Sequence, residues 1–258
     1  MNGKVYLVGG GPGDPELLTI KAQKILGRAN VVLHDALVSQ GVLAMSSPDA
    51  LRIHVGKRCG AKLLTQEEIN ALLVSYALTR DVVVRLKGGD PSIFGRAGEE
   101  ITALREAGVD FEIVPGITAP TAAAAAAGIS LTDRRIASQV LFTTLHRGAG
   151  NECIRWDGVP SATTVVIYMP GPDYAFVAQQ LREAGWPEDM PCAIVSNASR
   201  ENQQVRATRL GRLADGAALP APALIIVGRV LEGAPKEAAK EFWLGMRHGE
   251  FTDGPKAI

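Results

Sequence analysis

Short apolar runs alternate with helix-forming segments in the first half of the sequence, and this alternation limits the fold more than any other feature. Strands are predicted at 5–9, 31–34, 82–86 and 111–114. Asp14 is predicted to cap the first helix, and the capping box Thr65–Glu68 opens the second. The predicted helices cover 15–29, 66–80 and 94–107. Strands that alternate with helices form a mostly parallel sheet covered on both faces, so the sequence predicts an α/β fold.

The second half of the sequence has a different pattern, with two strand-like runs separated only by a polar loop. This spacing favours antiparallel pairing, because a parallel pair needs a longer crossover. An Ala-rich helix with Gly128 as its stop comes before this half. We therefore predict two α/β domains, 1–128 and 129–240, the second with a mixed sheet. Its strands are predicted at 139–143, 164–169, 192–196, 204–208 and 223–227.

Composition limits the compartment and the partners. The 258 residues carry no formal net charge, which gives no sign of a nucleic-acid or membrane surface. The three cysteines are far apart and form no CxxC pair, and the four histidines show no metal-ligand spacing. No signal peptide and no apolar run of transmembrane length is recognised. The sequence therefore predicts a cytoplasmic protein that binds no metal, nucleic acid or membrane.

Three loops follow predicted strands, where ligands of open α/β sheets bind. They are GGGPGDP at 9–15, KGGDP at 87–91 and PGITAP at 115–120. Glycines let the main chain approach a ligand, and the amides that open the Ala-rich helix can bind a carboxylate. Taken alone, each of the first two loops is about as well explained by a plain turn as by ligand binding, and the third can be an ordinary helix cap. The first loop lacks the Gly-x-Gly-x-x-Gly register and a Walker lysine, which argues against a dinucleotide-binding oxidoreductase.

Basic residues gather near these loops although the chain as a whole is neutral. Arginine binds carboxylates through two parallel hydrogen bonds, so this concentration favours an acidic substrate. Each cation taken singly is better explained as solvated surface charge. Asp35 directly follows the predicted strand 31–34, and a turn or cap is its simpler explanation. The basic residues are Lys57, Arg58, Arg85, Lys87, Arg96, Arg134, Arg135, His146 and Arg147.

Taken together and in order, these segments resemble the uroporphyrinogen-III C-methyltransferase family. The resemblance runs from about residue 5 to residue 230 and is densest in the first half. In the second half it rests mainly on 163–169, 197–199 and the closing strand. Asp133 stands where the family generally has His, and Thr143-Thr144-Leu145-His146 replaces a more usual Thr-Gly-His. The matching segments are VYLVG (5–9), GPGDPELLT (11–19), VLHDALVS (32–39), GKR (56–58), TQEEIN (65–70), RLKGGDP (85–91), IFGR (93–96), GEE (98–100) and VPGITA (114–119).

The resemblance implies two α/β domains with a cleft between them, a homodimer, and S-adenosylmethionine bound in the cleft. It implies methylation of uroporphyrinogen III at two positions, through precorrin-1 to precorrin-2, for sirohaem or cobalamin biosynthesis. Asp35 is implied as proton acceptor, Lys57 as proton donor, and Arg96 and Glu99 as tetrapyrrole contacts. No metal is implied, because a sulfonium methyl group is already electrophilic. The implied contacts of S-adenosylmethionine, whose product is S-adenosylhomocysteine, are Pro12, Gly88, Gly89, Asp90, Ile93, Thr118, Ala119, Met169 and Ala198.

Two alternatives stay open at this point. One is a paralogue that methylates a later precorrin, and the other is a protein that binds a tetrapyrrole without turnover. The sequence also shows no dehydrogenase–ferrochelatase module, which some relatives carry in fusion. We therefore expect the chain to supply its product to other enzymes.

Overall fold

The computed structural model describes residues 3–56, 64–144, 156 and 158–233 of the chain. The chain divides into two compact units, Met1–Ala119 and Pro120–Ile258. The Ala-rich helix α5 (Ala119–Ala126), which was predicted at the end of the first domain, lies almost entirely in the second unit. No helix among the described residues is long and apolar enough to cross a membrane.

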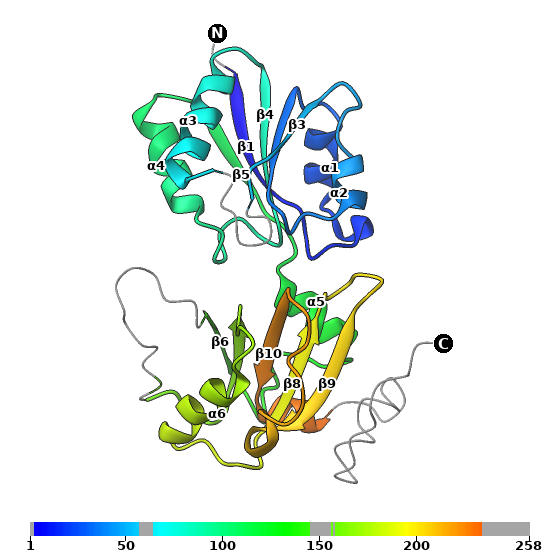
Figure 1. Ribbon diagram of the computed structural model, residues 1–258, viewed down its shortest axis with the longest axis vertical. Coiled ribbons are helices and arrows are strands. Elements are labelled where there is room, and N and C mark those ends of the chain that lie inside the picture. Colours follow the sequence, from blue (N-terminus) through cyan, green and yellow to red (C-terminus); the bar gives the residue numbers. More distant parts are fainter. Residues whose placement is uncertain (1–2, 57–63, 145–155, 157, 234–258) are drawn as a thin grey trace. The chain divides into compact units, whose positions relative to one another are not determined.

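The first unit carries a five-stranded sheet in the order β3-β2-β4-β1-β5 (Figure 1). Every strand pair in it is parallel, as the alternating pattern predicted. All four residues of β2 are buried, which is expected when helices cover both faces of a parallel sheet. The strands are β1 (Lys4–Gly9), β2 (Val31–His34), β3 (Leu51–His54), β4 (Val82–Lys87) and β5 (Phe111–Val114).

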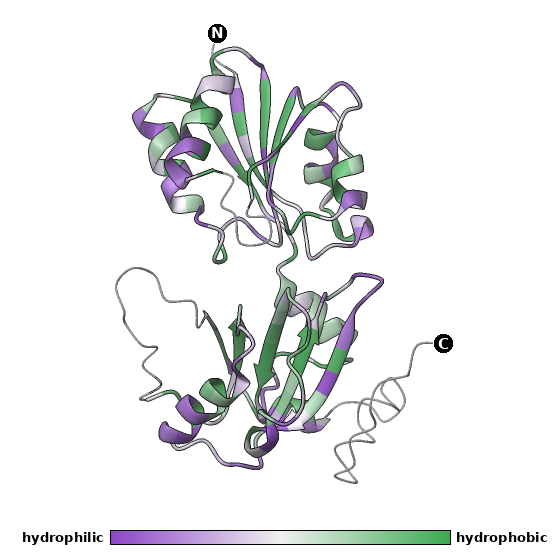
Figure 2. Cartoon of the chain, in the orientation of Figure 1, coloured by the Kyte–Doolittle hydropathy of each residue, from purple (hydrophilic) through white to green (hydrophobic). Residues whose placement is uncertain are grey.

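In β1, β2 and β4, apolar residues at alternate positions pack into two different clusters. Val5 and Leu7 lie in the cluster formed with α3 and α4, whereas Tyr6 and Val8 lie in the cluster formed with α1 and α2. Figure 2 shows hydrophobic residues concentrated along these strands. The helices are α1 (Ile20–Leu26), α2 (Gln40–Ala44), α3 (Gln66–Ala77) and α4 (Ala97–Glu106).

Two of the predicted helices begin later than the sequence indicated. The segment 15–29 is a 3-10 turn, Pro15–Leu17, followed by α1. Thr19 separates them, because it is extended (ψ 145°) and its hydroxyl accepts a hydrogen bond from the amide of Ala22 at 3.2 Å. Phe94 and Arg96 have φ of 50° and 55°, which a right-handed helix excludes, so α4 begins only at Ala97.

The second unit has a mixed sheet in the order β6-β7-β10-β8-β9. β6 and β7 are parallel, and the other pairs are antiparallel, including the predicted pair β8–β9. Helix α6 (Tyr174–Glu183) packs Val177 and Leu181 against this sheet, and α5 ends before Gly128, whose φ is 64°. The strands are β6 (Gln139–Thr144), β7 (Thr163–Tyr168), β8 (Pro191–Ser196), β9 (Gln204–Arg209) and β10 (Ala223–Val227), and the remaining 3-10 turns are Leu210–Arg212 and Arg229–Gly233.

Candidate functional site

The loops after β1 and β4 are joined by main-chain hydrogen bonds at the carboxyl edge of the first sheet. The amide of Gly10 donates to the carbonyl of Lys87 at 2.7 Å. Gly11 and Gly89 exchange two hydrogen bonds, of 3.2 and 2.7 Å, and form an isolated antiparallel bridge. Because β1 and β4 are parallel neighbours, their following loops leave the sheet side by side.

The loop after β5 packs against the same junction. A Cβ atom on Gly116 would overlap the carbonyl oxygen of Gly89 and lie 2.8 Å from Cα of Gly9, so only glycine fits there. The carboxylate of Asp90 accepts hydrogen bonds from the amides of Gly116 (3.0 Å) and Ser92 (2.8 Å). Asp90 thereby ties the second loop to the third, and the three loops predicted from the sequence form one cluster.

This cluster brings together several of the predicted cofactor contacts. A Cβ atom on Gly89 would lie 3.9 Å from Cα of Thr118 and 4.0 Å from the nitrogen of Ala119. One on Gly88 would lie 3.0 Å from Cβ of Leu37, in the loop after β2. Seven of the nine predicted contacts therefore belong to the first unit and lie in or beside these loops: Pro12, Gly88, Gly89, Asp90, Ile93, Thr118 and Ala119.

Asp35, the predicted proton acceptor, lies directly after β2 at the same edge. Its amide donates to the carbonyl of Leu86 at 3.2 Å, and its side chain is 29% exposed. Nη2 of Arg85 donates to Oδ1 of Asp35 at 2.5 Å. A Cβ atom on Gly56 would overlap the amide of Ala36, so Gly56 packs against the chain beside Asp35. The predicted proton donor, Lys57, lies outside the described residues.

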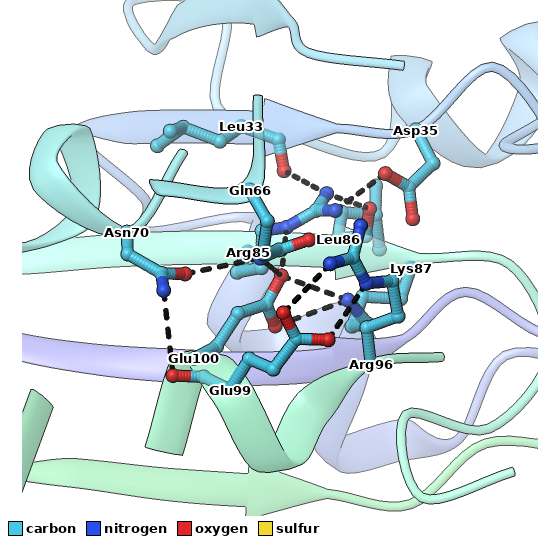
Figure 3. A network of polar contacts seen from close by, with 10 residues as sticks. All are labelled: Leu33, Asp35, Gln66, Asn70, Arg85, Leu86, Lys87, Arg96, Glu99 and Glu100. Atoms are coloured by element: carbon cyan, nitrogen blue, oxygen red, sulfur yellow. Dashed lines mark hydrogen bonds and ion pairs between the residues drawn. The ribbon is translucent and has the colours of Figure 1, made fainter. Parts of the chain in front are cut away.

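A buried ionic network lies behind Asp35 (Figure 3). Nε of Arg85 donates to Oε1 of Glu100 at 2.9 Å, and Nζ of Lys87 contacts both carboxylate oxygens of Glu100 at 2.9 and 3.0 Å. The side chains of Arg85 and Lys87 are 3% exposed and that of Glu100 is fully buried. Burial lowers the pKa of Lys87, although Glu100 opposes this effect.

The positions of these three residues follow from the periodicity of β4 and α4. Val83, Arg85 and Lys87 share one face of β4, and Val83 belongs to the apolar cluster beneath α3 and α4. Glu100 and Leu104 are four residues apart on α4, so both point toward that face.

Arg85 and Lys87 are therefore neither solvated surface charges nor contacts of an acidic substrate, the two explanations that the sequence offered, because both are buried and paired within the protein. Glu100 was not predicted as a site residue. The available signal was the pair of cations inside the apolar run VVVRLK, since buried cations require a counter-charge.

The predicted tetrapyrrole contacts form an exposed pair at the start of α4. Nε and Nη2 of Arg96 donate to the two carboxylate oxygens of Glu99 at 2.7 and 2.6 Å, and the side chains are 55% and 48% exposed. The main-chain carbonyl of Glu99 accepts from Nδ2 of Asn70 at 3.4 Å. Unlike Arg85, Arg96 is more than half exposed, so a ligand that replaces Glu99 can reach it.

In the second unit, Met169 and Ala198 emerge at one edge of the mixed sheet. Tyr168 at the end of β7 and Val195 in β8 both pair with Leu224 of β10, so the chain leaves β7 and β8 in the same direction. Met169 has φ of 49° and is 49% exposed, and Ala198 is buried. Non-glycine residues in left-handed conformations are sparse in proteins and gather at functional sites.

The departures from the family pattern at Asp133 and Leu145 belong to the second unit. Asp133 accepts two hydrogen bonds from the side chain of Arg135, at 3.0 and 2.7 Å, and these bonds lower the pKa of Asp133 to about 2. Leu145 lies outside the described residues, as do Arg58, His146 and Arg147. Within the described part of the chain, no group of three His, Cys, Asp or Glu side chains is placed to hold a metal ion.

The first unit has glycine loops at the carboxyl edge of a parallel sheet, which is where open α/β proteins bind ligands. With the mixed-sheet unit that follows it in the chain, it defines a two-unit α/β protein with a ligand-binding sheet edge. The sequence model of the tetrapyrrole (corrin/porphyrin) methylases matches residues 4–214. The chain therefore belongs to the tetrapyrrole methylase family, a family of methyltransferases, as the resemblance predicted.

Relatives and solved structures agree with this assignment. The chain is 47% identical over 234 residues to a siroheme synthase of Methylobacillus flagellatus, with 89% of this chain and 50% of that protein covered. It is 43% identical over 258 residues to a siroheme synthase of Actinobacillus pleuropneumoniae, with 99% of this chain and 52% of that protein covered. The chain thus spans about half the length of these curated relatives.

Among solved structures, the uroporphyrin-III C-methyltransferase of Thermus thermophilus superposes with a TM-score of 0.78 at 38% identity, covering 89% of this chain and 99% of that one. The same Thermus enzyme in complex with S-adenosylhomocysteine gives a TM-score of 0.77. A cobalt-precorrin-4 methyltransferase superposes with a TM-score of 0.76 at 31% identity, covering 88% of this chain and 95% of that one.

Proposed function

We propose that the chain transfers methyl groups from S-adenosylmethionine to two carbons of uroporphyrinogen III, giving precorrin-2 through precorrin-1. The observation that carries this proposal is the single cluster formed by the loops after β1, β4 and β5, with the carboxylate of Asp35 at the same edge. It is supported by 38% identity over almost the whole length of the Thermus uroporphyrin-III C-methyltransferase.

The loop cluster suits a ligand such as S-adenosylmethionine, which supplies an electrophilic methyl group when bound. Gly88 and Gly89 bring main chain rather than side chains to the sheet edge beside Thr118 and Ala119, so polar ligand groups can be recognised by backbone amides and carbonyls. We propose all seven first-unit residues as cofactor contacts. Met169 and Ala198 stay predictions from the sequence.

The proposed chemistry needs positioning and one acid–base pair, both supplied by side chains of the chain. Aligning a pyrrole carbon with the methyl group is catalysis by orientation. Methylation at carbon also moves protons, and we assign Asp35 as acceptor and Lys57 as donor. Arg96, released from Glu99, would bind one of the substrate's carboxylates through two hydrogen bonds.

The direct test is an anaerobic incubation of the protein with uroporphyrinogen III and methyl-labelled S-adenosylmethionine. We expect two labelled methyl groups for each macrocycle, detected by mass spectrometry. Asp35→Asn, which keeps the shape of the side chain but removes the base, serves as the matched control and should form little product. Absence of labelled product with the wild-type protein contradicts the proposal.

A second candidate acceptor is a later precorrin. The likeness to a cobalt-precorrin-4 methyltransferase favours it, together with Asp133 at a position where uroporphyrinogen methylases generally have His. Repeating the assay with a later precorrin as acceptor distinguishes the two. Methyl transfer to that acceptor, with none to uroporphyrinogen III, supports the second candidate.

We also propose that the chain acts as a homodimer, as the family resemblance implies, and that it works in the cytoplasm, as its dispersed cysteines indicate. Light scattering at assay concentrations tests the dimer, because a molar mass near that of a single 27.2 kDa chain contradicts it.

A further inference from the structure

We propose that Glu100 and Arg85 are positioning residues for Asp35: Glu100 on α4 fixes the guanidinium of Arg85, and Arg85 fixes the carboxylate that takes the proton. This inference rests on the proposed function, in which Asp35 is the acceptor. It adds to that function a buried network of side chains that, among the described residues, contacts the reacting edge through Asp35.

The first step is that all three nitrogens of the Arg85 guanidinium have hydrogen-bond acceptors. Nη2 donates to Asp35 and Nε donates to Glu100, while Nη1 lies 3.4 Å from the carbonyl of Leu33 and 3.3 Å from that of Leu86. A planar group with every nitrogen engaged has no freedom to rotate. The orientation of Nη2 toward Asp35 is therefore set by the opposite side of the guanidinium, where Glu100 binds.

The second step is the fixing of Glu100 itself. Its Oε1 accepts from Arg85, from Lys87 and, at 3.4 Å, from Nε2 of Gln66, while its Oε2 accepts from Lys87. Gln66 in turn donates to Oδ1 of Asn70 at 3.0 Å (Figure 3). Lys87 supplies the second positive charge, which balances the network at two cations and two carboxylates.

The exposure of the four side chains differs in a way that indicates function. Arg85 and Lys87 are 3% exposed and Glu100 is fully buried, whereas Asp35 is 29% exposed. The network therefore presents one carboxylate to the sheet edge and keeps its other charges away from water. Buried ion pairs are weak evidence for stability, because apolar residues of similar size often stabilise a core as well. The positioning of Asp35 accounts for a network whose buried charges are unfavourable to desolvate.

A double-mutant cycle separates positioning from a purely structural role. The variants Glu100→Gln, Asp35→Asn and the double variant are assayed for methyl transfer to uroporphyrinogen III. We expect Glu100→Gln to lower kcat about 10- to 100-fold, since small misplacements of catalytic groups cost that much, with the KM for S-adenosylmethionine unchanged. In the Asp35→Asn background, Glu100→Gln should lower kcat no further.

Arg85→Lys provides a second test that keeps the buried positive charge. A lysine offers one ammonium group and cannot bridge Asp35 and Glu100 as the guanidinium does, so its kcat should fall nearly to that of Asp35→Asn while circular dichroism stays native. Glu112→Gln is the matched control for Glu100→Gln. Glu112 lies on β5, outside the loop cluster, and pairs with Lys4 and Lys21. Its kcat should equal that of the wild type.

Three results overturn the inference. An equal loss from Glu100→Gln with and without Asp35 shows that Glu100 does not act through Asp35. A wild-type kcat in Arg85→Lys shows that the bridge is not needed. A wild-type protein that transfers no methyl group refutes the proposed function and this inference with it, whereas an active wild type with additive variants refutes the inference alone.

Discussion

The two units each present loops at the edge of a five-stranded sheet, but they hold those loops in different ways. In the first unit, glycine main chain is packed against glycine main chain, and a buried ionic network lies behind Asp35. In the second unit, the turns after β7 and β8 contain Met169, Asn197 and Ser199 in left-handed conformations. The first edge depends on close packing and buried charge, whereas the second depends on unfavourable backbone angles. Substitutions at the first edge should therefore lower the free energy of unfolding, whereas glycine at a left-handed residue of the second edge should raise it.

The largest expected effect is the loss of one charge from the buried network. Glu100→Gln leaves Arg85 paired with Asp35 and removes the carboxylate that Lys87 contacts, and it should lower the free energy of unfolding by about 3–5 kcal/mol. Urea denaturation measures this loss. Glu99→Gln, which changes the neighbouring exposed residue, should cost only about 0–1 kcal/mol. Equal losses in the two variants would contradict the distinction between buried and exposed charge on α4.

A somewhat smaller effect is expected from one added methyl group at the loop junction. Gly116→Ala places Cβ against the carbonyl oxygen of Gly89, and the overlap should cost about 1–3 kcal/mol of unfolding free energy. Because the three loops must move apart, methyl transfer should also be lost. Gly98→Ala is the control: nothing lies within 4 Å of its added Cβ, and the change to alanine in the first turn of α4 should be neutral or stabilising. A fully active Gly116→Ala protein would show that the junction tolerates rearrangement.

At the edge of the second unit, a glycine substitution should stabilise. Met169→Gly removes a side chain from a left-handed position at φ 49°, and should raise the unfolding free energy by about 0.5 kcal/mol after the entropy of the unfolded glycine is counted. If Met169 also contacts S-adenosylmethionine, the KM for that substrate rises in the same variant. Leu78→Gly, at an exposed residue with φ −75°, should destabilise instead. A Met169→Gly protein less stable than the wild type would break the comparison between the edges.

The first sheet and its loops could be predicted because period-two apolar runs and glycine clusters are local signals. β2 and β5 were predicted to the residue, and the three loops meet at one edge because parallel strands all end there. Segments α2 and β3, of five and four residues, were missed because elements so short contain little periodicity.

The buried network could not be predicted in the same way. Glu99 and Glu100 are adjacent and chemically identical, and only the helical phase decides which one faces the sheet. That phase depends on where α4 begins, and the left-handed residues Phe94 and Arg96 delay its start to Ala97. Glycine is the usual marker of a left-handed residue, and neither position has one. The direction of Glu100 is thus a tertiary property, set when Arg85 and Lys87 on β4 require a counter-charge.

The smallest effect concerns an ion pair of the second unit, and it contrasts with the buried network of the first. The hydrogen bonds from Arg135 hold the pKa of Asp133 at about 2, below its ordinary value of 3.8. A depressed carboxyl pKa contributes stability above the unfolded value, and this contribution is lost as the pH falls from 3.8 through about 2. Arg135→Gln should return the pKa of Asp133 toward 3.8, as followed by NMR titration. It should also remove the pair's contribution to stability at neutral pH, which is small because water screens this exposed pair. A large loss of stability at neutral pH would place this pair with Arg85–Glu100 rather than among ordinary surface pairs.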